Sequence, residues 1–106
     1  MPDDIELAVL VGRFEAAVGQ EEALAAVLAK YVVLTRRRPS CRNVDLVASV
    51  LHPGRFTIIE KWVGADAPRA HLDDPETVEM AEGAKPLLAG PPDLDLSDAV
   101  SAQDLE

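Results

Sequence analysis

The chain has 106 residues, of which 48% are hydrophobic, and its formal net charge is −9. That length favours one globular domain with a thin core. The negative charge excludes nucleic acid as an expected partner, because binding to phosphates needs clustered Lys and Arg side chains. No apolar run approaches the roughly 20 residues of a membrane span.

A single cysteine, Cys41, excludes an internal disulfide, and no Cys/His cluster has the spacing of a metal site. The acidic N-terminal residues contain no apolar signal core. We therefore expect a cytoplasmic protein that has no metal, no membrane partner and no nucleic-acid partner.

The chain begins with a predicted strand and helix. Residues 5–16 combine β-branched side chains with loose alternation, which is typical of a strand. Residues 20–37 carry acidic side chains in the first turn and apolar ones at helical spacing, which predicts a helix. Three arginines at 36–38 suit the end of that helix, and Pro39 stops it.

A β-hairpin follows. Residues 43–51 form the second predicted strand and residues 55–63 the third. The turn between them is His-Pro-Gly at 52–54, and a turn this short makes the two strands antiparallel.

Two helices and a fourth strand complete the chain. Residues 66–73 predict a short helix, and Pro75 opens a longer one that runs to Leu88 with a bend or break at Gly83–Pro86. Residues 93–100 alternate well enough for a last strand.

The element order β-α-β-β-α-β predicts an α+β, ferredoxin-like domain with a four-stranded antiparallel sheet. We expect one domain over residues 1–106, with a core at about 5–100 and a loose tail at 101–106. Helices can cover only one face of such a sheet, yet the first three strands carry apolar side chains on both faces. Burial of the second face predicts a homodimer in which two sheets pack together.

Six short motifs occur in an order and spacing that one family shares. They are Gly19–Glu22, Arg38–Cys41, Pro53–Phe56, Glu60–Trp62, Ala70–Leu72 and Pro86–Gly90. In this set the chain resembles the antibiotic biosynthesis monooxygenase family over roughly residues 7–98. The resemblance implies a dimeric α/β barrel with a pocket between sheet and helices in each protomer. It also implies a cofactor-independent monooxygenase that oxidises a quinol or polyketide-type aromatic with O2.

The chain departs from this family in two places. The Thr-Pro-His-Phe run of many members is replaced by Asp74–Thr77, which lacks the His and the Phe. The haem-degrading branch carries an Asn, a Trp and a His where this chain has approximately Gly12, His71 and Ala81. Two alternatives therefore stay open: a non-catalytic dimer that binds a small ligand, and haem binding or degradation, for which these contacts are missing.

A cofactor-free oxygenase needs an apolar pocket, a base and donors for the developing anion, because the substrate anion itself reduces oxygen. His71 is the first candidate base, since an ordinary pKa of about 6.5 suits proton transfer at neutral pH. The alternative is a helix histidine that bonds a backbone carbonyl. Glu60, on the same strand face as Trp62, is a candidate base or a group that orients His71. Its alternative is a structural role, in an ion pair with Arg13 or Arg55 or in a hydrogen bond.

Four residues are candidates for contacts with the substrate. Trp62 offers a flat ring for stacking, or else fills the core. Arg13 would stabilise a phenolate, Asn43 would be a polar pocket residue, and Tyr31 lies on the helix expected to cover the pocket. Each of these three also has a structural interpretation. Cys41 is expected to be a small buried residue.

Overall fold

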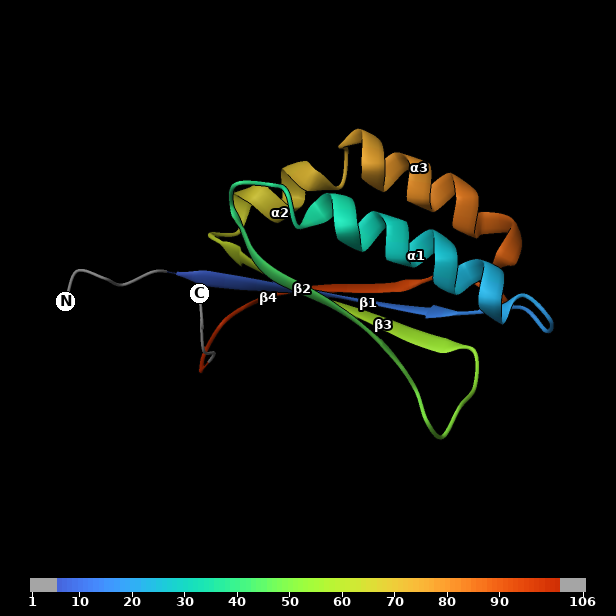
Figure 1. Ribbon diagram of the computed structural model, residues 1–106. Helices are drawn as coiled ribbons and strands as arrows, with labels where there is room; N and C mark the ends of the chain where they lie inside the picture. Colours follow the sequence, from blue (N-terminus) through green and yellow to red (C-terminus); the bar gives the residue numbers. More distant parts are fainter. Residues whose placement is uncertain (1–5, 102–106) are drawn as a thin grey trace.

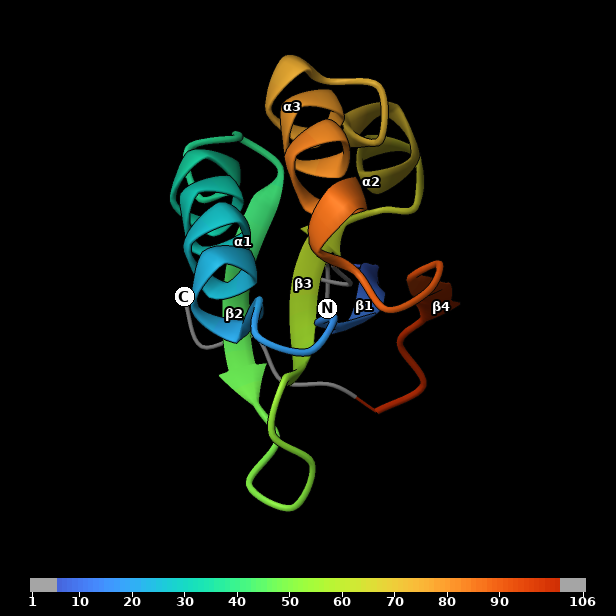
Figure 2. The ribbon, with the colours of Figure 1, turned by 90° about the vertical axis from the view of Figure 1, so that its right-hand side faces the viewer.

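One antiparallel sheet carries all the helices on one of its faces (Figures 1 and 2). The computed structural model describes residues 6–101. Its elements are β1 (Leu7–Glu15), α1 (Glu21–Thr35), β2 (Cys41–Ala48), β3 (Arg55–Val63), α2 (Asp66–His71), α3 (Pro75–Ala84), the 3-10 turn η1 (Lys85–Leu87) and β4 (Asp93–Asp98). The strand order β2-β3-β1-β4 places β1 and β3 at the centre. The predicted α+β, ferredoxin-like fold is confirmed.

The largest difference from the predicted boundaries is in the hairpin. β2 spans Cys41–Ala48 instead of the predicted 43–51. The loop between β2 and β3 is therefore longer than the predicted three-residue turn, and it is closed by a hydrogen bond of 2.9 Å from the Ser49 N–H to the Arg55 carbonyl. In Figure 1 this loop bends away from the helices.

The helix that begins at Pro75 breaks near the predicted place. α3 ends at Ala84 and continues as the 3-10 turn η1, because Pro86 has no N–H to donate within a helix. α2 and β4 each end two residues earlier than predicted, at His71 and Asp98. The predicted start of the first strand at residue 5 and most of the predicted tail lie outside the described residues.

The core lies between the helices and the face of the sheet that they cover. α1 turns Leu24, Leu28 and Tyr31 toward the sheet at a spacing of three to four residues, and all three are buried. They pack with apolar side chains from every layer; the core residues are Phe14, Leu24, Leu28, Tyr31, Val32, Val44, Phe56, Ile58 and Ala84. None of the described helices is long and apolar enough to span a membrane.

The opposite face of the sheet is not covered by any element within residues 6–101 (Figure 2). Strand alternation places Val9, Val11 and Ile59 on this open face, where Val11 pairs with Ile59 and all three are half-buried. Val47 and Val63, on the same face, are 46% and 41% exposed. The sheet therefore has apolar side chains on both faces, as the sequence predicts.

Candidate functional site

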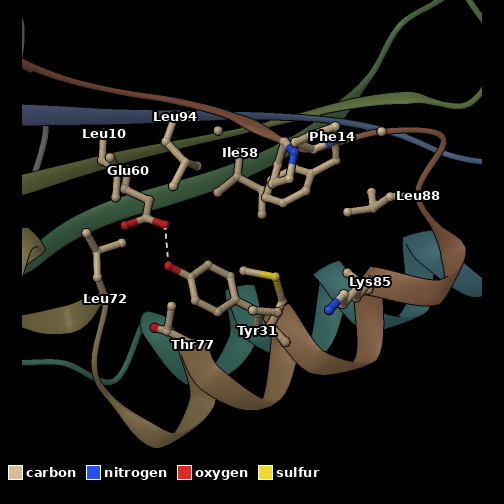
Figure 3. Close-up of a pocket in the computed structure, with 17 residues that line it drawn as sticks. Leu10, Phe14, Tyr31, Ile58, Glu60, Leu72, Thr77, Lys85, Leu88 and Leu94 are labelled. Carbon is tan, nitrogen blue, oxygen red and sulfur yellow. Dashed lines mark hydrogen bonds between the residues drawn. The ribbon is translucent and has the colours of Figure 1, made fainter.

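A cavity of about 670 Å³ lies between the sheet and α3 (Figure 3). Its apolar lining comes from the sheet, α3 and the segment before β4: Leu10, Gly12, Phe14, Ile58, Leu72, Met80, Ala81, Ala84, Leu88, Gly90, Pro91, Pro92 and Leu94. The lining residues with polar side chains are Tyr31, Glu60, Thr77 and Lys85. A concave, largely apolar site with a few polar groups is the usual form of a small-molecule pocket.

Glu60 is a buried carboxyl in the wall of this cavity, with 3% of its surface exposed. The alternation of β3 turns it toward the helices, and each oxygen accepts one hydrogen bond. The Tyr31 hydroxyl donates to Oε2 at 2.5 Å, and the Trp62 indole N–H donates to Oε1 at 2.8 Å. Burial raises the pKa of the Glu60 carboxyl, although the two hydrogen bonds oppose the shift. Within residues 6–101, no ion pair neutralises this carboxylate. Such a group can accept a proton from a bound hydroxyl.

Tyr31 stays a hydrogen-bond donor under all ordinary conditions. Burial, with the adjacent Glu60 charge, raises the pKa of its phenol far above the usual range. Its ring forms part of the cavity wall, and its hydroxyl points at the carboxylate (Figure 3). Tyr31 therefore fixes the direction of Glu60 rather than exchanging protons itself.

His71 lies behind this pair, and it does not line the cavity. It is 1% exposed, and its ring packs against Tyr31 and Trp62 with centroid distances of 5.5 and 5.0 Å. Nδ1 is 2.7 Å from the Asp74 carboxylate, and Nε2 is 3.0 Å from the Thr35 hydroxyl. Both ring nitrogens are thus engaged inside the protein, so the histidine positions the two aromatic rings that contact Glu60.

Arg38 anchors the far side of the histidine. Its guanidinium donates two hydrogen bonds to Glu76, at 2.6 and 2.7 Å, and its Nε lies 3.3 Å from Asp74. This arginine holds the pKa of Glu76 down at about 2. Ligand atoms of His71, Asp74 and Glu76 lie within 4.8 Å of one another, a spacing that a metal ion could bridge. Arg38 already supplies the positive charge at this position, which makes the cluster an ion-pair network.

Comparison with known proteins decides the family. The sequence model described as Antibiotic biosynthesis monooxygenase matches residues 8–83, most of the chain. The chain belongs to the antibiotic biosynthesis monooxygenase family. A search of curated proteins gives no match.

Solved structures share the fold of this family member along almost its whole length. Protein SO0527 of Shewanella oneidensis is 27% identical, with 91% of this chain and 93% of that chain covered and a TM-score of 0.82. Rv0793 of Mycobacterium tuberculosis is 22% identical, with 91% and 97% covered and a TM-score of 0.84. A Nitrosomonas europaea protein that bears the family's name is 16% identical, with 89% and 90% covered and a TM-score of 0.84.

The structure brings together four of the residues that the sequence singles out. Glu60, Tyr31, Trp62 and His71 form one connected cluster, but only Glu60 and Tyr31 line the cavity of this family member. Trp62 is 2% exposed and contacts Glu60 and His71. Its ring is therefore not placed to stack on a molecule in the cavity.

Arg13 and Asn43 lie on the open face of the sheet, away from the cavity. Both are exposed, and Arg13 is 3.9 Å from Asp93. The alternative of an ion pair between Glu60 and Arg13 or Arg55 is wrong, because strand alternation turns both arginines to the opposite face, but the alternative of a hydrogen bond is found. There Arg55 lies 4.0 Å from the carboxylate of a neighbouring strand residue.

The sequence reasoning missed the contribution of α3 to the cavity. Thr77, Met80, Ala84 and Leu88 all line it. They recur at intervals of three or four residues, which is the signature of one helix face. The small size of the alanine on this face, and the break after it, leave room for the cavity.

Proposed function

We propose that the protein is a cofactor-independent monooxygenase that oxidises a small phenolic aromatic, of the quinol or polyketide type, with O2. The observation that carries this proposal is Glu60, a buried carboxyl with a raised pKa in the wall of an otherwise apolar cavity. Membership of the antibiotic biosynthesis monooxygenase family supports the reaction class.

The proposed reaction needs a base and an apolar surrounding, and the cavity has both. A phenolic hydroxyl held against Glu60 gives its proton to the carboxylate, and the substrate anion then passes one electron to O2. The substrate radical and superoxide combine through a new carbon–oxygen bond, and the peroxide takes the proton back from Glu60. Where that carbon carries a hydrogen, loss of water leaves a carbonyl, so one oxygen atom enters the product. The apolar walls exclude water while the radical pair exists.

Oxygen uptake tests this assignment. Reduced naphthoquinones and anthrones are supplied to the protein, and O2 consumption is followed with an electrode. We expect Glu60→Gln to lower the rate by about 10²- to 10⁴-fold, the usual contribution of a general base. Glu79→Gln is the matched control, because Glu79 lies on α3, which lines the cavity, but its own carboxylate pairs with Lys30 outside the cavity.

Two results would contradict the proposal. Full activity of Glu60→Gln would remove this residue as the base. No uptake with any substrate of the panel would favour the alternative, a binding protein without catalysis, and a ligand that co-purifies in native mass spectrometry would identify that role.

We also propose that two copies associate through the open face of the sheet. The half-buried Val9, Val11 and Ile59 on that face support this, because a monomer would leave them in contact with water. Ile59→Asp should then yield a monomer in light scattering after size exclusion. Val78→Asp is the control, since Val78 is 45% exposed on α3. A wild-type monomer would contradict the proposal.

The proposed partners are thus a second copy of the chain, one small aromatic molecule and O2. Nucleic acid is not among the proposed partners, because a net charge of −9 disfavours binding to phosphates. We also propose a cytoplasmic location, where the one cysteine would stay reduced.

A further inference from the structure

The cavity carries one charge of each sign. Among the described residues that line it, Glu60 is the one acidic side chain and Lys85 the one basic side chain. Figure 3 shows Lys85 at the end of the cavity away from Glu60, whereas Thr77 lies at the Glu60 end. Thr77 and Lys85 are eight positions apart along α3 and its continuation, which corresponds to about 12 Å at the rise of a helix. The cavity is therefore elongated, with opposite charges toward its two ends.

Lys85 has no ion-pair partner within the part of the chain that the structure describes. Other basic side chains near α3 do have one: Lys30 lies 2.7 Å from Glu79, and Arg38 binds Glu76. A lysine that remains unpaired in a chain with 19 acidic and 10 basic residues is available to an anion from outside. The wall between Lys85 and Glu60 is apolar and suits flat rings.

We infer that the substrate is an elongated, multi-ring aromatic with an acidic group, such as a carboxylate, at the end opposite its reactive hydroxyl. The inference rests on the proposed function, which orients the hydroxyl toward Glu60. The acidic group then pairs with the Lys85 ammonium at the mouth of the cavity, and the rings fill the apolar space between them. Since the protein as a whole repels anions, a preference for an anionic ligand requires a local cation of this kind.

A pair of probes that differ only in the distal acid tests the inference without any turnover. The probes are 6-hydroxy-2-naphthoate and 2-naphthol, and their dissociation constants are measured by calorimetry under nitrogen at low salt. We expect the naphthoate to bind about threefold to fivefold more tightly than the naphthol, the range for one partly exposed ion pair. The preference should shrink when salt is added.

Variants of the lysine identify the source of the preference. Lys85→Met keeps most of the apolar stem and should abolish the preference, whereas Lys85→Arg should retain it. Lys30→Met is the matched control, because it removes one positive charge outside this cavity and should leave the preference unchanged.

Several results would overturn the inference: equal binding of both probes, binding of neither, or a preference that survives in Lys85→Met. The proposed oxidation is judged separately by oxygen uptake. A charge preference without uptake would contradict the oxidation alone. Uptake with neutral quinols and no charge preference would contradict the role of Lys85 alone.

Discussion

Removal of one oxygen atom by Tyr31→Phe tests whether the core really contains an ionised carboxylate. The Tyr31 hydroxyl donates to Glu60 at 2.5 Å, and both side chains are at most 3% exposed. A hydrogen bond to a charged group contributes about 1.5–3 kcal/mol, against about 0.5–1.5 kcal/mol for a neutral pair. At pH 9, where ionisation of Glu60 is favoured, we expect the variant to lose about 2 kcal/mol of unfolding free energy. The midpoint of thermal unfolding should fall by roughly 10 °C.

The same substitution in a Glu60→Gln background provides the control. Because the amide is neutral, Tyr31→Phe should cost about 1 kcal/mol there, and the difference between the two costs measures the contribution of the charge. Urea unfolding can be followed by the fluorescence of Trp62, the only tryptophan, at a fixed protein concentration. Equal costs in both backgrounds, or a cost below about 0.5 kcal/mol in the wild type, would refute the assignment of an ionised Glu60 held by Tyr31.

Three further predictions follow from the pKa shifts. Because burial raises the pKa of Glu60, the folded protein holds this proton more tightly than the unfolded chain. The unfolding free energy should therefore fall as the pH rises from the ordinary carboxyl range through the folded pKa of Glu60. In urea titrations at several pH values, Glu60→Gln should lack this decrease. Glu76 has the opposite sign, since Arg38 lowers its pKa to about 2. The stability advantage of wild type over Glu76→Gln should be full above about pH 5 and should shrink as the pH falls toward 2, and a constant difference would contradict this. Burial raises the pKa of Cys41 to about 11, so iodoacetamide should modify it at pH 8 much more slowly than it modifies glutathione. Fast modification would show that the thiol is not held in that environment.

The fold was accessible from sequence because its signals are local. The third strand has the bounds Arg55–Val63 in both prediction and structure, and Gly54 and Gly64 flank it. Both glycines take positive φ angles, 92° and 78°, which end a strand sharply. The same period-two alternation placed Glu60 and Trp62 on one face, as the structure has them.

Strand alternation also indicates which of the candidate residues cannot line the cavity, and the sequence-based choice of site residues did not apply it to Arg13 and Asn43. Arg13 is an odd number of positions from Leu10 and from Phe14, so it belongs on the face opposite these two cavity residues. Asn43 follows the same rule, because it directly precedes the buried Val44 and so belongs on the other face of the sheet. The register shift between Cys41 and Asn43 instead takes Cys41 out of this alternation, and short-range sequence patterns do not reveal such a bulge.

The burial of His71 could not be predicted from the sequence around it. Asp74 is only three positions from His71, but the hydrogen bond to Thr35 at the end of α1 joins residues 36 positions apart and forms only in the folded domain. The local sequence of a short helix is equally compatible with a buried histidine and with an exposed histidine that acts as a base. The choice of Glu60 over His71 therefore required the tertiary structure.

The position of Glu60 has a consequence for how such an enzyme can change its substrate. Its two hydrogen bonds come from α1 and from β3 itself. Much of the cavity wall that would meet the rings of a substrate comes instead from α3, η1 and the segment up to Leu94. Substitutions at Met80, Ala81 or Leu88 can therefore reshape the cavity without touching either donor to the carboxylate. In the proposed enzyme the chemistry and the specificity would belong to separate parts of the chain, so evolution or design could alter one while the other is kept.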